Sequence, residues 1–474
     1  MKKINCRGMH WVFIALLAVA ISLLTACPVV SGAGTETTES GENPRIKNVI
    51  FFIGDGMGPQ HRRIAGIFQG KGDPAHRLAL ENLKTSGIAY NHSLNALVTD
   101  SAASGTALAT GYKTNSGYIA MDPQGNQLKT ILELCRDNGK STGLITTVTI
   151  AHATPAAFAA HVNSRKKYSE IALQYLDQGV DLLMGGGWND FLPPAPAGQS
   201  VSYRSLYGKR KDHRNLVEDF QNKGYTFVHT RDGLMSLDTG KAEKLLGLFA
   251  PGAMAYEIDR DPSLEPHIAE MTAKAIEVLS RNPQGFFLMV EGGKIDWAGH
   301  GHDVAGVVHD TIAMDDAVKV ALKFAEKNPD TLIVVVEDHE TGGLAITANT
   351  SVERIGRLKA TAERMAGMIR KDGSNIREVF ETYAGIADLK DWEYKKVRDE
   401  VTGVAKYFDK WGYGGSVVAD IISQRTGVHF STGGHTGAPV LVAVQGPGCE
   451  IFDGFYDQTD IPRKIAELLG LELP

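Results

Sequence analysis

The sequence predicts an α/β protein: a mainly parallel central sheet with helices on both faces, and an added helical cap. From residue 45 onward, short runs rich in β-branched and aromatic residues alternate with segments of helical period. Such alternation is typical of parallel strands joined by helices. Glycine is abundant, with 52 residues concentrated after the apparent strands, where tight turns and close backbone approach to a ligand are needed. At 474 residues, the chain is expected to form one large domain over 45–474.

The first part of this domain gives its elements in a regular order. Apolar runs of strand length alternate with amphipathic stretches, and each run is bounded by turn-forming residues. The expected elements are strand 48–53, a helix near 101–110, helix 127–138, strand 142–147, helix 167–177 and strand 180–185.

In the second part, two helices each lead into a strand. Helix 264–281 carries apolar residues at helical spacing, and an Asn-Pro pair ends it before strand 286–290. Helix 310–326 precedes strand 331–336 in the same way. Residues 344 to about 430 are charged and helical, and we interpret them as an insertion that folds as the helical cap.

The N-terminal region has the pattern of an export signal. Three basic side chains in the first ten residues precede an apolar stretch at 11–24, which is too short to span a membrane comfortably. The tetrapeptide LTAC ending at Cys27 resembles a lipoprotein lipobox, so we expect a signal peptide over 1–27 and a lipid anchor on Cys27. An ordinary cleavage site near Ala26 or Ala33 is the alternative. Residues 28–44 read as a flexible tether, and the protein is expected to be periplasmic or on the cell surface.

The net charge bears on the class of binding partner, and the cysteine content bears on disulfide bonding. The formal net charge of −6 and the absence of a long basic run argue against a nucleic-acid-binding surface. Besides the two cysteines in the signal region, the chain has Cys135 and Cys449. Their spacing gives no disulfide framework, so we expect two buried free thiols, with a disulfide between them as the alternative.

Four distant segments are expected to place an acid or an imidazole just after a strand-like run, where a parallel strand would deliver it. They are NVIFFIGDGMG (48–58), FFLMVEGGKIDWAGH (286–300), TLIVVVEDHETGG (331–343) and GGHTGAPVLVAV (433–444). Ligands in open α/β sheets gather beyond the carboxyl ends of the strands, where such loops meet. Taken together, these carboxylates and imidazoles suit divalent metals. The candidates are Asp55, Glu291, Asp296, His300, Asp338, His339 and His435.

A fifth segment offers a nucleophile. In ALVTDSAASGTALATG (96–111), Ser101 stands at the start of a helix of small residues, where the helix dipole favours negative charge. The alternative for Ser101 is a helix N-cap, and for a single Asp-His pair a capped turn.

These motifs together resemble the alkaline phosphatases. The matching segments are GDGMG at Asp55, TDSAASGTA at Ser101, HATPAAFAAHVNSR (152–165), VEGGKID with His300, the EDH segment and GGHTG, and the resemblance covers roughly 45–343 and 425–470. It implies a three-layer α/β/α sandwich, hydrolysis of phosphate monoesters through a phosphoserine on Ser101, and a homodimer.

The resemblance also implies a set of metal and phosphate ligands. It assigns two Zn²⁺ and one Mg²⁺ to each subunit, and it gives Arg165 the grip on two phosphate oxygens, for which a planar guanidinium is well suited. By position, one zinc would be held by Asp296, His300 and His435, the other by Asp55, Asp338 and His339, and the magnesium by Asp55, Thr154 and Glu291.

Two positions depart from the pattern of some family members. His152 and Trp297 stand where those members carry an aspartate and a lysine. A histidine binds metal directly and prefers zinc or cobalt to magnesium, so either metal is an alternative at the third site. Losing the lysine removes a cation near the bound phosphate, from which we expect weaker product binding. His161, His302 and His309 match no ligand position.

Two other classes of function compete with this interpretation. The same metal core could act on diesters, sulfates or phosphonates, but the Cys/Ser-x-Pro-x-Arg context of sulfatases is absent around Ser101. Diesterase relatives commonly use threonine and lack the Arg165 pattern. A lipoprotein that binds phosphate or a surface partner without catalysis is the second alternative.

Overall fold

The computed structural model describes residues 46–200, 202, 205–405 and 416–474. The expected signal peptide, the lipobox with Cys27 and the tether 28–44 lie outside the described residues. Among the helices that are described, none combines the length and the apolar character needed to cross a membrane.

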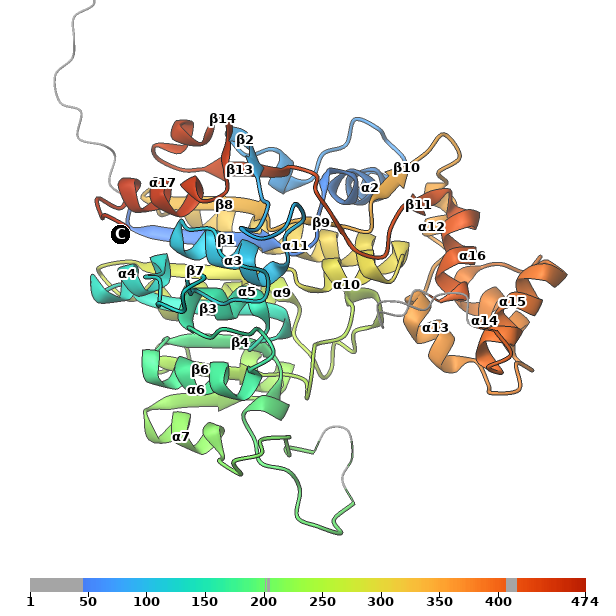
Figure 1. The fold of residues 1–474 in the computed structure, drawn as a ribbon, viewed down its shortest axis with the longest axis horizontal. Coiled ribbons are helices and arrows are strands. Elements are labelled where there is room, and N and C mark those ends of the chain that lie inside the picture. The colour runs from blue at the N-terminus through green and yellow to red at the C-terminus, as the bar shows by residue number, and fades with distance from the viewer. Residues whose placement is uncertain (1–45, 201, 203–204, 406–415) are drawn as a thin grey trace, which may run out of the picture. The chain divides into compact units, whose positions relative to one another are not determined.

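A ten-stranded, mainly parallel sheet organises the domain (Figure 1). Its order is β14-β2-β13-β8-β1-β7-β3-β4-β6-β5, and β13 alone runs antiparallel to its neighbours β8 and β2. The predicted α/β fold class is confirmed. The strands are β1 (Asn48–Gly54), β2 (Thr85–Tyr90), β3 (Ser141–Thr149), β4 (Leu182–Gly186), β5 (Tyr225–Val228), β6 (Lys244–Leu248), β7 (Phe286–Glu291), β8 (Thr331–Glu337), β13 (Val440–Gln445) and β14 (Gly454–Asp457).

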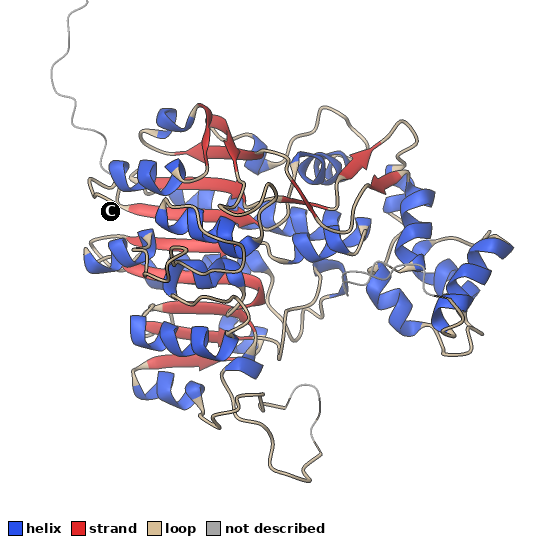
Figure 2. Ribbon diagram, in the orientation of Figure 1, coloured by secondary structure: helices blue, strands red, loops and turns tan. Residues whose placement is uncertain are grey.

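Helices cover both faces of this sheet (Figure 2). Alternate side chains of β1 enter two different apolar clusters, Val49 and Phe51 one of them and Ile50 and Phe52 the other. Because successive side chains of a strand point to opposite faces, this division marks the two sides of a fully buried sheet. The helices are α2 (Pro59–Gln69), α3 (Ser101–Thr110), α4 (Ile131–Asp137), α5 (Ala153–Ala159), α6 (Tyr168–Gln178), α7 (Leu216–Asn222), α8 (Arg231–Met235), α9 (Ile268–Leu279), α10 (Lys294–His300), α11 (Val304–Ala325) and α17 (Asp460–Leu468).

Helix starts differ from the predicted ones where a cap fixes them. Helix α4 begins at Ile131 rather than at 127, because Thr130 and Glu133 form a capping box. Helix α11 begins at Val304, six residues before the predicted start, because the Asp303 carboxylate accepts a hydrogen bond from Gly306 N. The spacing of the apolar residues predicted both helices, but it did not predict the residues that cap them.

The cap lies between two short paired strands. Strand β10 (Leu344–Ile346) pairs antiparallel with β11 (Val428–Phe430), so the insertion leaves and re-enters the domain at one place. One apolar cluster holds the cap together and joins it to residues of α2, α10 and α11. Its helices are α12 (Val352–Ile355), α13 (Ala362–Met368), α14 (Ile376–Ala384), α15 (Asp391–Val401) and α16 (Val417–Thr426).

Cys135 and Cys449 are both buried and not bonded to each other. The prediction of two buried free thiols is therefore confirmed. Burial raises the pKa of the Cys135 thiol to about 12, so this thiol is unreactive.

Candidate metal centre

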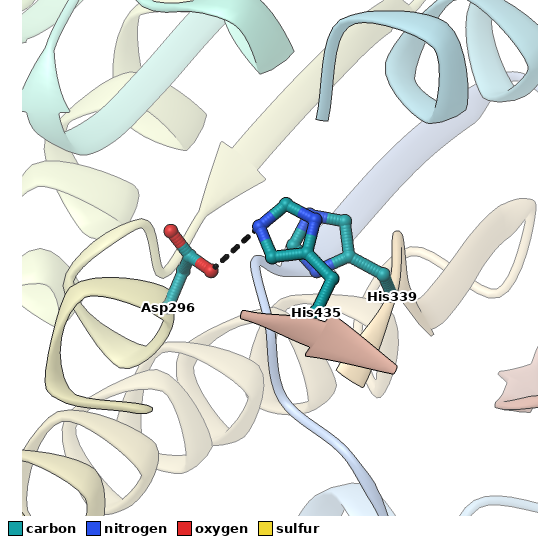
Figure 3. Close-up of side chains that lie close together, drawn as sticks. All are labelled: Asp296, His339 and His435. Carbon is teal, nitrogen blue, oxygen red and sulfur yellow. Dashed lines mark ion pairs between the residues drawn. The ribbon is translucent and has the colours of Figure 1, made fainter. Parts of the chain in front are cut away.

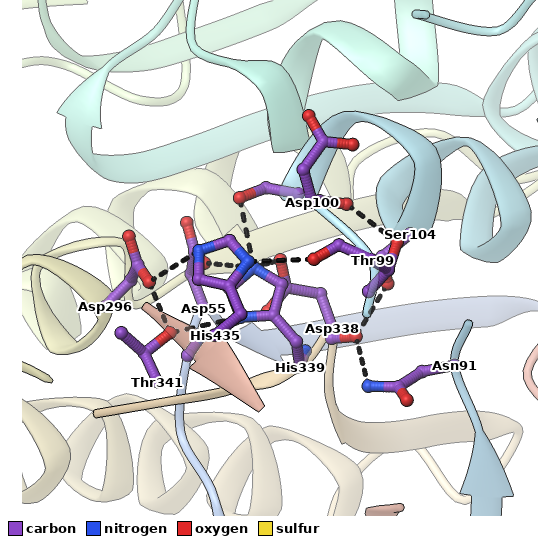
Figure 4. Close-up of polar contacts among 12 residues, drawn as sticks. Asp55, Asn91, Thr99, Asp100, Ser104, Asp296, Asp338, His339, Thr341 and His435 are labelled. Atoms are coloured by element: carbon purple, nitrogen blue, oxygen red, sulfur yellow. Dashed lines mark hydrogen bonds and ion pairs between the residues drawn. The ribbon is translucent and has the colours of Figure 1, made fainter. Parts of the chain in front are cut away.

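The predicted carboxylates converge at one edge of the sheet. Strands β8, β1 and β7 are neighbours, and their carboxyl ends deliver Asp338, Asp55 and Glu291 side by side. Figure 4 shows Asp55 and Asp338 at this edge. All three side chains are fully buried. Adjacent parallel strands end at the same edge, so the sheet itself sets these residues next to one another.

His435 reaches this edge by a different route from the predicted one. It does not follow a strand but precedes β13, in the short strand β12 (His435–Thr436). Because β13 runs antiparallel to β8, the residues before it lie where the parallel strands end. The expected location is correct, although the stated reason was wrong.

A first cluster contains Asp296, His300 and His435. Asp296 and His300 stand four residues apart on α10 and so share one helix face. The Oδ1 atom of Asp296 lies 3.3 Å from His300 Nε2 and 3.6 Å from His435 Nε2. Figure 3 draws Asp296 and His435 facing each other, with His339 stacked behind His435. The three residues are placed as a tridentate set.

The two imidazoles of this cluster are oriented by the backbone. His300 Nδ1 lies 2.7 Å from Gly433 O, and His435 Nδ1 lies 2.8 Å from Thr99 O. Since a carbonyl oxygen only accepts, each Nδ1 carries a proton, and each Nε2 faces the other members of the cluster. Metal-binding histidines are commonly oriented in this way.

A second cluster contains Asp55, Asp338 and His339. His339 Nε2 lies 3.2 Å from Asp338 Oδ2 and 3.5 Å from Asp55 Oδ1. Both oxygens of Asp55 and Oδ2 of Asp338 are buried without a hydrogen bond among the described residues. Burial raises the pKa of the Asp55 carboxyl well above its ordinary value, and the charge of Asp338 raises it further. Buried, unsatisfied carboxylates fit a cation, which would offset both effects.

A third cluster brings His152 to Asp55 and Glu291. Nδ1 of His152, Oε1 of Glu291 and Oγ1 of Thr154 are buried without a hydrogen bond in the described part of the chain. The other oxygen of Glu291 accepts a hydrogen bond from Thr146, a residue that the sequence analysis did not single out. The oxygens of Asp55, Thr154 and Glu291 fit a cation, and the His152 imidazole lies beside them.

Ser101 faces the second cluster. It is the first residue of α3 and is buried, and its Oγ lies 3.2 Å from His339 Nε2. The N-cap of α3 is Asp100, whose side chain accepts from Ala103 N, so the alternative of an N-cap serine is wrong. Hydrogen bonds from Ser104 Oγ and Asn91 Nδ2 to Asp338 O hold α3 and the residue after β2 against the loop that carries Asp338 and His339 (Figure 4).

Arg165 is oriented beside Ser101 by two partners. Its Nη1 donates to Asp100 Oδ2 at 3.0 Å, and its Nη2 lies 3.1 Å from His152 Nε2. Burial lowers the pKa of His152 to about 3, with help from the charge of Arg165, so this imidazole is neutral and accepts the hydrogen bond. Trp297 packs edge-on against His152, with ring centroids 6.4 Å apart.

The remaining histidines have other partners, as expected. His161 hydrogen-bonds Glu133 and the backbone oxygen of Ala120, and His302 hydrogen-bonds Thr432 O. His309 packs against Phe68.

The sequence analysis missed Thr341 and Asp100. Thr341 Oγ1 donates to Asp296 Oδ1 at 2.6 Å and lies 3.2 Å from His339 Nδ1 (Figure 4). The only indication of this contact in the sequence is that Thr341 follows His339 by two residues. Asp100 Oδ2 accepts from Arg165, and its place directly before Ser101 was the corresponding signal.

Comparisons with known proteins agree with this geometry. The family model for alkaline phosphatase matches residues 46–471. Alkaline phosphatase 4 of Bacillus subtilis (strain 168) is 36% identical over 471 residues, covering 95% of this chain and 95% of its own. The alkaline phosphatase of Thermus thermophilus superposes with a TM-score of 0.82 at 30% identity, over 94% of this chain and 96% of its own. The cold-active phosphatase of Shewanella sp. gives 0.77 at 31% identity, over 89% and 99%.

Proposed function

Because the chain belongs to the alkaline phosphatase family, we propose that it hydrolyses phosphate monoesters outside the cytoplasm through a phosphoserine on Ser101. The single observation that carries this role is the position of Ser101 Oγ, buried and 3.2 Å from His339 Nε2 at the junction of the clusters. Among the small residues of α3, this hydroxyl is the one at the helix start, where the dipole stabilises a developing negative charge.

The proposed reaction has two displacement steps. Ser101 Oγ attacks phosphorus while the P–O bond to the alcohol breaks, and the serine proton is lost as the alcohol oxygen gains one. Arg165, fixed by Asp100 and His152, binds two of the non-bridging oxygens. Water then cleaves the phosphoserine, which releases inorganic phosphate and restores the hydroxyl.

We assign two Zn²⁺ to the first and second clusters and a third ion to the remaining cluster. Mixed imidazole and carboxylate ligands suit zinc, and Asp55, Thr154 and Glu291 supply oxygens for Mg²⁺. When bound, such ions polarise the phosphate and stabilise charge on the attacking and leaving oxygens. His152 beside Asp55 and Glu291 makes zinc or cobalt the alternative for the third ion. In the related phosphatase TAB5, a histidine-to-aspartate variant was solved with magnesium bound in its M3 site.

We propose that the protein is a homodimer. A segment close to Ser101 carries several exposed apolar side chains, and Leu97 among them is 92% exposed. The segment is joined to residues 112–116 by hydrogen bonds such as Leu94 N to Thr114 O, so it forms one defined surface. Exposed apolar patches of this kind are typical of protein interfaces. The exposed side chains are Tyr90, Leu94, Leu97, Val98 and Tyr112.

Export and a lipid anchor on Cys27 complete the proposal. They are supported by the basic, apolar and LTAC segments at the start of the sequence. Labelling with radioactive palmitate should mark the natural protein and not a Cys27→Ser variant. An unlabelled natural protein would leave ordinary signal cleavage as the explanation.

Release of the aryl alcohol from an aryl monoester and from an aryl diester tests the proposed function directly. The monoester should be hydrolysed much faster, a chelator should abolish the reaction, and Zn²⁺ with Mg²⁺ should restore it. Preference for the diester would favour the diesterase alternative, and no turnover of either ester would favour a binding protein. Ser101→Ala should keep the bound metal and lose the activity.

A further inference from the structure

We propose that Thr341 is a positioning residue that links the first and second metal clusters through its hydroxyl group. The inference rests on the metal assignment proposed above. Thr341 itself belongs to neither cluster, but it contacts a residue of each: Asp296 in the first and His339 in the second. Figure 4 shows its side chain between the two.

The direction of the hydrogen bonds follows from the number of protons. A threonine hydroxyl has one proton to donate and two lone pairs that accept. The carboxylate of Asp296 only accepts, so the short 2.6 Å contact takes the hydroxyl proton. Oγ1 of Thr341 is then free to accept, and His339 Nδ1 at 3.2 Å carries a proton to donate.

This arrangement fixes the tautomer of His339. With the proton on Nδ1, the lone pair on Nε2 faces Ser101 Oγ and the carboxylates of Asp55 and Asp338. His300 and His435 obtain the same tautomer from backbone carbonyl oxygens. His339 alone among the three obtains it from a side chain, so its orientation can be removed by a point substitution that leaves every ligand in place.

The surrounding backbone is built closely around this threonine. Strand β9 (Glu340–Thr341) pairs with β12 so that Thr341 lies opposite His435, and Thr341 N donates to Gly56 O at 3.0 Å. A Cβ atom added at Gly56 would lie 2.7 Å from Thr341 Oγ1, and one added at Gly299 would lie 2.8 Å from Thr341 O. The two glycines leave the space that the side chain and backbone of Thr341 need.

The consequence is that the two clusters share one hydrogen-bonded chain. Without the hydroxyl, Asp296 Oδ1 loses a charge-assisted hydrogen bond and His339 keeps a buried N–H with no acceptor. Each cluster would then hold its ion with less preorganised ligands. Removing such an outer hydrogen bond commonly costs about 10- to 100-fold in metal affinity.

Thr341→Val is the test, because valine keeps the branched shape and removes the hydroxyl. The protein is loaded with Zn²⁺ and challenged with a chromophoric chelator, and the release of zinc is followed with time. The natural protein should release the two ions of the first and second clusters together, and Thr341→Val should release them about 10- to 100-fold faster and in separate phases. Thr341→Ser, which keeps the hydroxyl, should behave as the natural protein.

The tautomer is measured independently of metal. Long-range proton–nitrogen spectra of the metal-free protein with labelled histidine should show the Nδ1–H form of His339, and Thr341→Val should show a mixture. If Val alters folding, as judged by circular dichroism, Thr341→Ala compared with Thr341→Ser gives the same contrast.

Two outcomes would overturn the proposal. Zinc release from Thr341→Val at the natural rate would mean that the hydroxyl does not position the ligands. Equal effects of Thr341→Ser and Thr341→Val would mean that the exact shape of the whole side chain matters, and not its hydroxyl group. Neither measurement needs turnover, so failure of the proposed hydrolysis would appear separately, as absent activity in a protein that still binds zinc.

Discussion

The Nε2 atoms of His300 and His435 lie 3.2 Å apart and face each other, because each Nδ1 is hydrogen-bonded to a backbone carbonyl oxygen. Two lone pairs at this distance repel each other unless a proton or a cation lies between them. With Asp296 beside them, the pair is arranged for one ion.

Replacing His435 by alanine should therefore weaken zinc binding to the first cluster by at least about 100-fold, because one of three ligands is lost. Isothermal titration of the metal-free protein with Zn²⁺ measures the change. His302→Ala is the matched control, since His302 lies near the cluster in sequence but hydrogen-bonds Thr432 O. A similar loss in both variants would argue against His435 as a ligand.

Ser101→Ala should reduce phosphate release from an aryl monoester by at least about 1,000-fold while the zinc content stays unchanged, because the nucleophile is removed and the ligands remain. Phosphate release and metal analysis on one preparation check this. Ser116→Ala should keep full activity, since the Ser116 hydroxyl hydrogen-bonds that of Ser93 rather than a cluster residue. Substantial activity in Ser101→Ala would assign the attack to water.

Trp297→Lys should strengthen inhibition by inorganic phosphate, because it places a cation next to the phosphate site. The natural protein has an ammonium group close by, that of Lys294, but its Nζ lies over the rings of Trp297 and Tyr256. We expect the inhibition constant to fall several-fold, or about 1 kcal/mol, with a slower product release. Trp297→Met controls for the loss of the ring. Equal inhibition in all three proteins would contradict this prediction.

His152→Asp should shift the metal preference of the third cluster toward Mg²⁺, because it replaces the imidazole beside Asp55 and Glu291 by a hard oxygen. Activity measured against Mg²⁺ concentration should rise in this variant and depend weakly on Mg²⁺ in the natural protein. His161→Asn serves as the control, since His161 contacts Glu133 rather than a cluster. An unchanged magnesium response would show that His152 does not influence this site.

The buried pair of His161 and Glu133 should make stability depend on pH. Burial opposes the charge of His161, but the hydrogen bond to Glu133 raises the pKa of His161 above 6.5. Burial likewise opposes the charge of Glu133, but His161 holds the pKa of Glu133 below 4.5. A raised histidine pKa stabilises the fold below 6.5 and a lowered glutamate pKa above 4.5, so the pair contributes most between these values and fades as pH rises further.

Glu133→Gln tests this pair, because it removes the charge and keeps the oxygen that caps α4. Its loss of stability should be about 1.5–3 kcal/mol near pH 6 and smaller at pH 9. Thermal unfolding of the two proteins at both pH values gives the comparison. A difference that does not change with pH would mean that His161 is neutral in the fold.

Much of the centre was predictable because it depends on strand ends. Asp55, Glu291 and Asp338 follow apolar runs that only buried parallel strands explain, so the sequence alone places them at one edge. His435 was also expected at this edge, but as a residue that follows a parallel strand. It precedes the antiparallel strand β13 instead, and the direction of that strand depends on tertiary pairing. The period of α11 was visible, but its start depends on the local cap at Asp303.

Thr341 could not be predicted because its role depends on pairing between distant residues. It lies opposite His435 only when β9 and β12 pair across the whole cap. A threonine beside a histidine has no distinguishing pattern in one sequence. The same holds for Asp100, whose contact with Arg165 joins a loop before α3 to a segment 65 residues away.

The place of His435 after the cap determines when the first cluster can be completed. Asp296 and His300 are synthesised long before the last imidazole of their cluster, which follows the cap and requires β9 to meet β12. A growing or shortened polypeptide that stops within the cap has two of these three ligands. The cluster of Asp296, His300 and His435 is therefore complete only after the cap and β12 have been synthesised. The cap also has to fold in a way that lets β9 and β12 pair on either side of it.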